Sequence, residues 1–133
     1  MGSGDHRIAP AGEALGAVAG EAYCYLTTTG RRSGRQHTIE IWFATDGASL
    51  YLISGGRDRS DWVRNLQASP RAHVRIGDTS VAVNARVPLD QPASERDRAV
   101  RLLHTKYGSQ VSGNLADWQR DAFIVALDPE PDR

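Results

Sequence analysis

The chain of 133 residues is long enough to form one domain with a substantial hydrophobic core. Sixteen basic side chains balance sixteen acidic ones, so a general nucleic-acid binder is not expected. The sequence has no run of about 18 apolar residues and no signal-peptide pattern, which predicts a cytoplasmic protein without stable membrane insertion. The single cysteine, Cys24, lies in the apolar stretch AYCYL and is predicted to be a buried, inert thiol.

The first half of the chain is predicted to contain a tail and three strands. Residues 1–20 are interpreted as an N-terminal tail with a short, glycine-rich helix at 11–20, and residues 21–133 as one folded domain. Aromatic and β-branched residues, alternating polarity and the turn signal Asp46-Gly47 indicate the strands. The predicted strands are 21–29, 36–45 and 49–54.

The second half is predicted to contain two helices and three strands. Ser60 is expected to cap a short helix that Pro70 ends. Ser94 is expected to cap the longest helix, which Gly108 closes and whose apolar stripe includes Val100, Leu103 and Tyr107. The remaining predicted strands are 72–76 and 81–87, which flank the turn at Gly77-Asp78, and 122–127.

These elements predict an α+β fold with a mostly antiparallel sheet of six strands and two or three helices. Strands and helices do not alternate regularly, so a doubly wound fold is not expected. At this length, closure of the sheet into a small barrel is favoured over an open sheet.

The loop TTTGRRSGRQHT, residues 27–38, has a composition that suits an anion-binding site. Glycines let the chain bend sharply and expose backbone N–H groups, while guanidinium groups and a hydroxyl add further donors. This pattern predicts a cradle for a phosphate or a carboxylate, with a solvated basic hairpin loop as the open alternative. The residues concerned are Gly30, Arg31, Arg32, Ser33, Gly34, Arg35 and His37.

A second candidate is the segment SGGRDRSDW, which follows a predicted strand. Ser54, Gly55 and Gly56 would allow the backbone to approach a flat ligand closely, and the helix that starts at Asp61 would favour an anion. A plain glycine-rich connection is the alternative.

Several other chemistries are excluded by pattern. The sequence contains neither a P-loop nor a G-x-G-x-x-G motif, and no serine occupies a G-x-S-x-G elbow. No metal site is expected, because the four histidines have no ligand-like spacing. They are His6, His37, His73 and His104.

Three segments together resemble the deazaflavin-dependent nitroreductase family of actinobacteria: LTTTGRRSGRQHTIEIWF, LYLISGG and DWVRNLQASPRAHVRIG. The resemblance covers residues 21 to 128. It implies the split β-barrel fold that this family shares with the flavin-binding pyridoxamine-phosphate oxidases. It also implies binding of coenzyme F420, a deazaflavin that carries a phosphodiester and an oligoglutamate tail.

The resemblance assigns parts of the cofactor to the two candidate segments. The phosphate would lie on the arginine-rich loop, the glutamate tail near Arg35, His37 or Arg57, and the ring beside the serine-glycine-glycine segment. The cofactor-binding residues that it implies are Arg31, Arg32, Ser33, Gly34, Arg35, His37, Ser54, Gly55, Gly56, Trp62 and Asn65.

The implied function is that of an F420-dependent oxidoreductase that transfers a hydride to a small molecule such as an enone, a quinone or a nitro compound. Several family members have a tyrosine-rich segment late in the chain. This sequence keeps Tyr107 there, as a candidate proton donor or pocket wall, but then departs from the family with GSQVSGNLADW. The substrate pocket is therefore expected to differ from that of the nitroimidazole-activating members. An FMN-binding relative of the pyridoxamine-phosphate oxidases, a non-enzymatic carrier of a cofactor or lipid, and a homodimer remain open.

Overall fold

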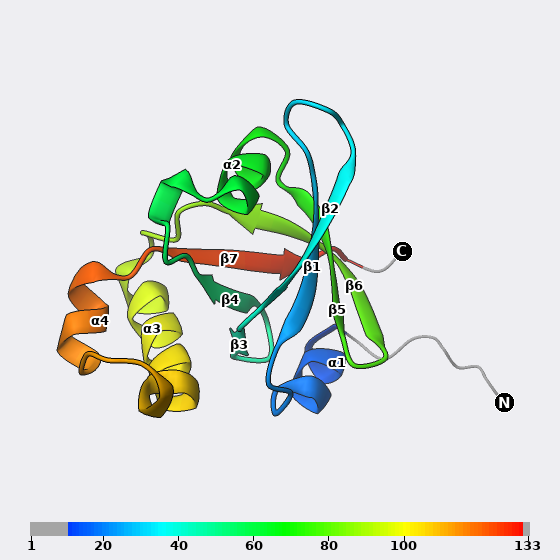
Figure 1. Ribbon diagram of the computed structural model, residues 1–133. Helices are drawn as coiled ribbons and strands as arrows, with labels where there is room; N and C mark the ends of the chain where they lie inside the picture. The colour runs from blue at the N-terminus through cyan, green and yellow to red at the C-terminus, as the bar shows by residue number, and fades with distance from the viewer. Residues whose placement is uncertain (1–10, 132–133) are drawn as a thin grey trace, which may run out of the picture.

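A single antiparallel sheet of seven strands curls around the core of the protein, whose computed structural model describes residues 11–131 (Figure 1). The strand order is β2-β1-β5-β6-β7-β4-β3. This architecture confirms the predicted α+β split-barrel class. The strands are β1 (Cys24–Thr29), β2 (Gln36–Ile41), β3 (Ala44–Thr45), β4 (Leu50–Ile53), β5 (Arg71–Ile76), β6 (Thr79–Arg86) and β7 (Ile124–Pro129).

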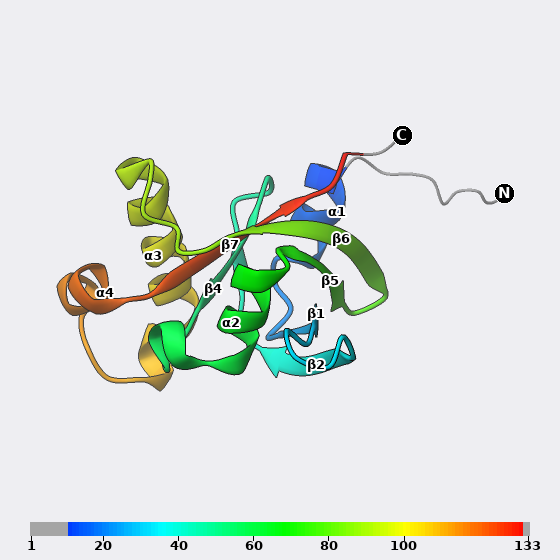
Figure 2. The same cartoon turned by 90° about the horizontal axis from the view of Figure 1, so that it is seen from above.

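Of the four helices in residues 11–131, three lie at two places on this sheet, and α1 lies apart from them, in contact with β6. Figures 1 and 2 show α3 and α4 side by side next to the β4 and β7 end, whereas α2 packs against β1. The helix α4 was not predicted from the sequence. The helices are α1 (Ala11–Val18), α2 (Asp61–Ala68), α3 (Ala93–Tyr107) and α4 (Leu115–Asp121), with short 3₁₀ turns at Arg57–Arg59 and Gly108–Gln110.

Two hydrophobic cores lie on opposite faces of β4 and β7. The inner core, enclosed by the curled sheet, includes Leu52 and Leu127. The outer core, under α3, includes Tyr51, Ile124 and Leu103. Because both faces of these two strands are buried, their sequences LYLI and IVAL are continuously apolar instead of alternating.

The predicted strand at 36–45 is one segment that changes partners in the middle. Its first half, β2, pairs with β1, and its second half, β3, pairs with β4, so the two edge strands of the sheet are joined through Trp42 and Phe43. The Phe43 N–H donates to the Tyr107 hydroxyl at 3.1 Å, and the Phe43 carbonyl accepts from Lys106 Nζ at 3.0 Å. The end of α3 thus satisfies backbone groups that have left the strand ladder.

Of the two predicted helix caps, Ser60 has the expected position without the expected hydrogen bond, and Ser94 does not have the expected position. Ser60 does precede α2, but its hydroxyl shares a hydrogen bond of 2.9 Å with the Ser54 hydroxyl and makes no bond to the amides of the helix. The helix α3 begins at Ala93 after Pro92, which places Ser94 inside the first turn.

The buried thiol of Cys24 was predicted correctly. Cys24 is fully buried, and burial raises the pKa of its thiol to about 12, which keeps it protonated and unreactive. Among residues 11–131, no helix is both long and apolar enough to cross a membrane.

A cluster of charged side chains fixes the start of α3 to β4, β6 and β7. Arg86 donates to both carboxylate oxygens of Glu95 at 2.7 Å and to Asp128 at 2.8 and 2.9 Å. The Tyr51 hydroxyl lies 2.8 Å from Glu95 and 2.9 Å from Asp46. The Arg86 guanidinium lowers the pKa of Glu95, whereas burial raises the pKa of Tyr51, so this cluster holds ionised carboxylates around a neutral phenol.

Candidate functional site

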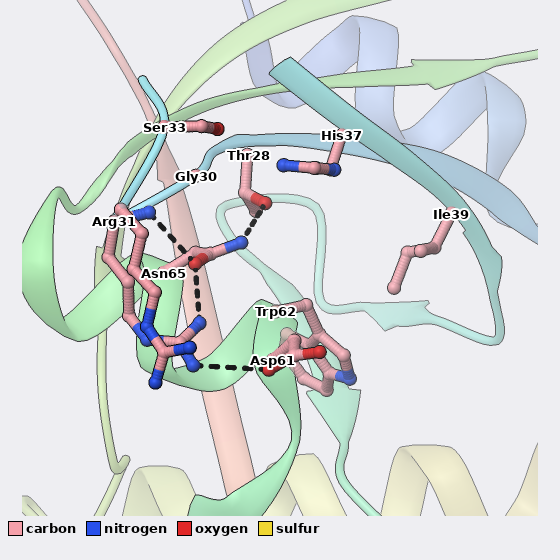
Figure 3. Close-up of a pocket in the computed structure, with 10 residues that line it drawn as sticks. Thr28, Gly30, Arg31, Ser33, His37, Ile39, Asp61, Trp62 and Asn65 are labelled. Carbon is pink, nitrogen blue, oxygen red and sulfur yellow. Dashed lines mark hydrogen bonds and ion pairs between the residues drawn. The ribbon is translucent and has the colours of Figure 1, made fainter. Parts of the chain in front are cut away.

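A cavity of about 390 Å³ lies between the β1–β2 loop and the start of α2 (Figure 3). We call it the loop cavity. It brings together six of the residues predicted to bind the cofactor, although these come from segments about thirty positions apart. The residues that line it are Thr28, Gly30, Arg31, Arg32, Ser33, His37, Ile39, Asp61, Trp62 and Asn65.

A hydrogen-bonded pair, Arg31 and Asn65, connects the loop to α2. The Asn65 Oδ1 atom accepts from the Arg31 backbone N–H at 3.1 Å and from the Arg31 Nη1 at 2.9 Å (Figure 3). Its Nδ2 donates to Thr28 Oγ1 at 3.2 Å, and both Asn65 and Thr28 are buried. A buried amide with its polar atoms satisfied holds the arginine side chain in a defined place at the cavity wall.

The glycines of the loop are required by its geometry. Gly34 has a φ of 75°, and its N–H donates to the Gly30 carbonyl at 2.9 Å, which closes a tight turn. A Cβ on Gly30 would lie 2.7 Å from the His37 Nε2 atom, so a larger residue would displace the imidazole from its place beside the loop. The Ser33 hydroxyl accepts from the Arg35 N–H at 3.1 Å. Gly34 and Arg35 shape this loop but do not line the cavity.

The loop cavity contains many donors and one carboxylate. Arg31 Nη2 lies 3.2 Å from Asp61 Oδ1, in an ion pair whose acidic side chain is 86% exposed. Such an exposed pair contributes only up to about 1 kcal/mol, so a phosphate can replace the carboxylate as the partner of the guanidinium. Arg32 is exposed and has no carboxylate partner within the described part of the chain.

A second cavity, of about 640 Å³, lies between the end of β4, the 3₁₀ turn at Arg57–Arg59 and α4. We call it the α4 cavity. Three aromatic side chains, Trp42, Trp118 and Phe123, give it flat apolar walls. The other residues that line it are Ile53, Ser54, Gly55, Arg57, Val111, Ser112, Gly113, Asp117, Arg120, Asp121 and Ala122.

One segment, residues 54–62, contributes to both cavities. Ser54 and Gly55 line the α4 cavity, whereas Trp62 lines the loop cavity. A Cβ on Gly55 would meet no atom within 4 Å, so the space above it is open. A Cβ on Gly56 would lie 2.5 Å from Ser60 Oγ, and Gly56 lines neither cavity.

Tyr107 lies behind the α4 cavity. Its side chain is buried, and its hydroxyl lies 2.7 Å from the Ala22 carbonyl and 2.9 Å from the Phe43 carbonyl. Its ring stacks on Trp42 with 4.3 Å between ring centroids and an interplanar angle of 2°. Burial also raises the pKa of the phenol. This geometry does not favour the role of proton donor that the sequence suggested; Tyr107 instead supports the wall formed by Trp42.

Sequence reasoning missed the wall that α4 provides. Asn114 and Asp117 form a reciprocal capping box at the start of this helix, a local signal that could have revealed it. Trp118 then faces the cavity, with its Nε1 donating to the Ser112 carbonyl at 3.2 Å. No comparable local signal could have joined Thr28 to Asn65, which are far apart in the sequence.

The family of the chain follows from a comparison with known proteins. Residues 8–116 match the model of the family described as F420H(2)-dependent quinone reductase. The chain belongs to the F420H2-dependent quinone reductase family. Membership confirms the predicted enzyme class, an F420-dependent oxidoreductase.

Solved structures share the fold of this F420H2-dependent quinone reductase family member. A conserved hypothetical protein of Mycobacterium tuberculosis matches with a TM-score of 0.69 and 19% identity over 100% of this chain and 87% of its own. An F420-H2 dependent reductase matches with 0.61 and 22% identity over 80% and 93% of the two chains. A putative pyridoxamine 5'-phosphate oxidase of Listeria innocua matches with 0.60 and 19% over 91% and 92%.

Proposed function

We propose that this protein uses reduced F420 to reduce a flat, conjugated carbonyl compound, with quinones as the first substrate class and enones as the next. The observation that carries this proposal is the position of residues 54–62 between a donor-rich cavity and an aromatic one. Reduced F420 supplies a hydride when it is bound. The protein supplies binding and orientation on either side of this segment.

The loop cavity fits the anionic part of the cofactor. Arg31, Arg32, Ser33 and His37 would hold the phosphate, because guanidinium, hydroxyl and imidazole groups are charge-assisted or neutral donors to its oxygens. Asn65 would hold the Arg31 side chain in place while the phosphate replaces Asp61, the exposed ion-pair partner of Arg31. Gly34 and Arg35 would act by shaping the loop.

The α4 cavity fits the flat parts of the reaction partners. Ser54 and Gly55 form an edge with open space above the glycine, which suits the close approach of a planar ring. Trp42, Trp118 and Phe123 offer faces on which a conjugated acceptor can stack. Their bulk would also exclude water from the acceptor.

Titration of the purified protein tests the cofactor assignment. F420 is expected to bind at least about tenfold more tightly than FMN, since its tail offers additional carboxylates and tenfold requires only about 1.4 kcal/mol. F420H2 should also support the reduction of menadione by the protein. Equal affinities, or a preference for FMN, would contradict the proposal.

Alanine substitutions in the loop test the phosphate site. Arg31→Ala and Arg32→Ala are each expected to weaken F420 binding by about 1.5–3 kcal/mol, the range for charged hydrogen bonds, with little change in turnover at saturating cofactor. Arg64→Ala is the matched control, because it removes an exposed positive charge from the neighbouring helix α2 without altering the cavity lining. If the binding free energy of F420 changes by less than about 0.5 kcal/mol in both Arg31→Ala and Arg32→Ala, the loop is only a solvated turn and not a phosphate site.

A further inference from the structure

Arg57 combines a strained backbone with a position at a cavity wall. Its φ of 55° is the only positive value for a non-glycine residue among residues 11–131. This conformation costs a residue with a side chain roughly 1–2 kcal/mol, and such strain concentrates at functional sites. The turn is held from both sides: the Ser54 hydroxyl donates to the Arg57 carbonyl at 2.8 Å, and the Arg57 N–H donates to the Ser54 carbonyl at 3.2 Å.

The side chain of Arg57 reaches across the α4 cavity wall. Its Nη1 donates to the backbone carbonyl of Asp121, the last residue of α4, and its Cζ lies 5.9 Å from the centroid of the Phe123 ring. Within residues 11–131 it forms no ion pair with a carboxylate. A guanidinium has five N–H donors, so most of those on Arg57 are available to a ligand.

The other charges of the α4 cavity bind one another. Arg120 Nη2 lies 3.3 Å from Asp117 Oδ1 and 3.0 Å from Asp121 Oδ2. The exposed fractions of these three side chains are between 44% and 66%, so solvent screens them strongly. Arg57 is therefore the cation in the described lining whose charge no carboxylate compensates.

We infer that Arg57 determines acceptor specificity by binding an anionic oxygen, an ionised hydroxyl or a carboxylate, on a flat ring held between the aromatic walls. This inference rests on the proposed function, because it requires the acceptor to lie in the α4 cavity. A guanidinium donates two parallel hydrogen bonds to the two oxygens of a carboxylate, or to an ionised hydroxyl and the carbonyl next to it. The nearby aromatic rings lower the polarity around these hydrogen bonds. The competing explanation is that Arg57 only caps the C-terminal end of α4.

Two naphthoquinones of matched shape separate these explanations. Lawsone carries an ionisable hydroxyl where menadione has a methyl group, so it is anionic at neutral pH and menadione is not. Their dissociation constants would be measured by calorimetry on the full-length protein saturated with oxidised F420, which prevents turnover. Arg57→Gly removes the guanidinium and tolerates the positive φ.

Arg57→Gly is expected to weaken lawsone binding at least about tenfold while menadione binding changes by less than about twofold. Arg59→Ala removes an exposed charge from the same turn, outside both cavities, and should change neither constant. If Arg57→Gly leaves the ratio of the two constants unchanged, the inference is overturned and the proposed function stands. A capping role predicts this last result, with both affinities and the thermal midpoint falling together.

Trp118→Leu tests the proposed function on which the inference rests. Loss of an aromatic wall should weaken the binding of both naphthoquinones. If neither compound binds the wild-type protein, or if Trp118→Leu changes neither constant, the α4 cavity is not the acceptor site, and both the inference and the proposed acceptor site fail.

Discussion

Gly55→Val is expected to weaken F420 binding by at least about a hundredfold and to leave the fold intact. A Cβ at this position meets no protein atom within 4 Å, so the protein itself has room for a larger side chain. The branched side chain would instead fill the open edge of the α4 cavity, where a planar ring must approach the backbone. Calorimetric titration with F420, alongside the thermal midpoint of the variant, measures both effects.

Gly20→Val is the control for Gly55→Val. Gly20 is exposed, has equally open space at its Cβ and lines neither cavity, so valine there should change neither affinity nor stability by much. If Gly55→Val loses stability but keeps its affinity for F420, the glycine serves only the turn, and the Ser54–Gly55 edge does not belong to the cofactor site.

Arg86→Met is expected to lower the free energy of unfolding at pH 7 by about 2–3 kcal/mol. The substitution leaves the Glu95 side chain, which is 14% exposed, and Asp128 without their guanidinium partner. Removal of one member of a buried ion pair typically costs 3–5 kcal/mol, and the partial exposure of Arg86 reduces that to about 2–3 kcal/mol. Urea unfolding measures the change. Arg101→Met removes an exposed ion pair with Asp97 on α3 and should lower the free energy of unfolding by less than about 0.5 kcal/mol.

The effect of Arg86→Met should also depend on pH in a defined direction. The hydrogen bonds from Arg86 lower the pKa of Glu95 in the folded protein below the unfolded value of about 4.3. The stability that this interaction contributes is therefore complete above about pH 5 and is lost as the pH falls through the lowered pKa. The difference between wild type and Arg86→Met should shrink as the pH is lowered from 7 towards 3. A difference independent of pH would assign the loss to packing.

The fold was largely predictable because its signals are local. Alternation along 36–45 and the glycine turns at Gly47 and Gly77 mark the strands and hairpins without reference to the rest of the chain. The break of that strand at Trp42 and Phe43 was not predictable, because it depends on a hydroxyl from Tyr107, more than sixty positions away.

The candidate site was also predictable only in part: the sequence indicated several of its residues, but not the contacts between them. Arg31 and Asn65 were both selected from the sequence, but the contact between them, which fixes the guanidinium, exists only once α2 packs against β1. Ser60 occupied the expected position before α2, yet its hydroxyl bonds to Ser54, because a nearby hydroxyl offers a competing partner. Trp118 was missed together with the short helix that carries it.

Trp42 belongs to the segment that joins the two edge strands of the sheet, and Tyr107 stacks against its ring. This wall of the α4 cavity is therefore anchored to the sheet and to α3, whereas the opposite wall is carried by a helix of seven residues outside the sheet. If the α4 cavity receives the acceptor as proposed, replacements and length changes in α4 would alter the range of acceptors with less disturbance to the sheet than a replacement of Trp42.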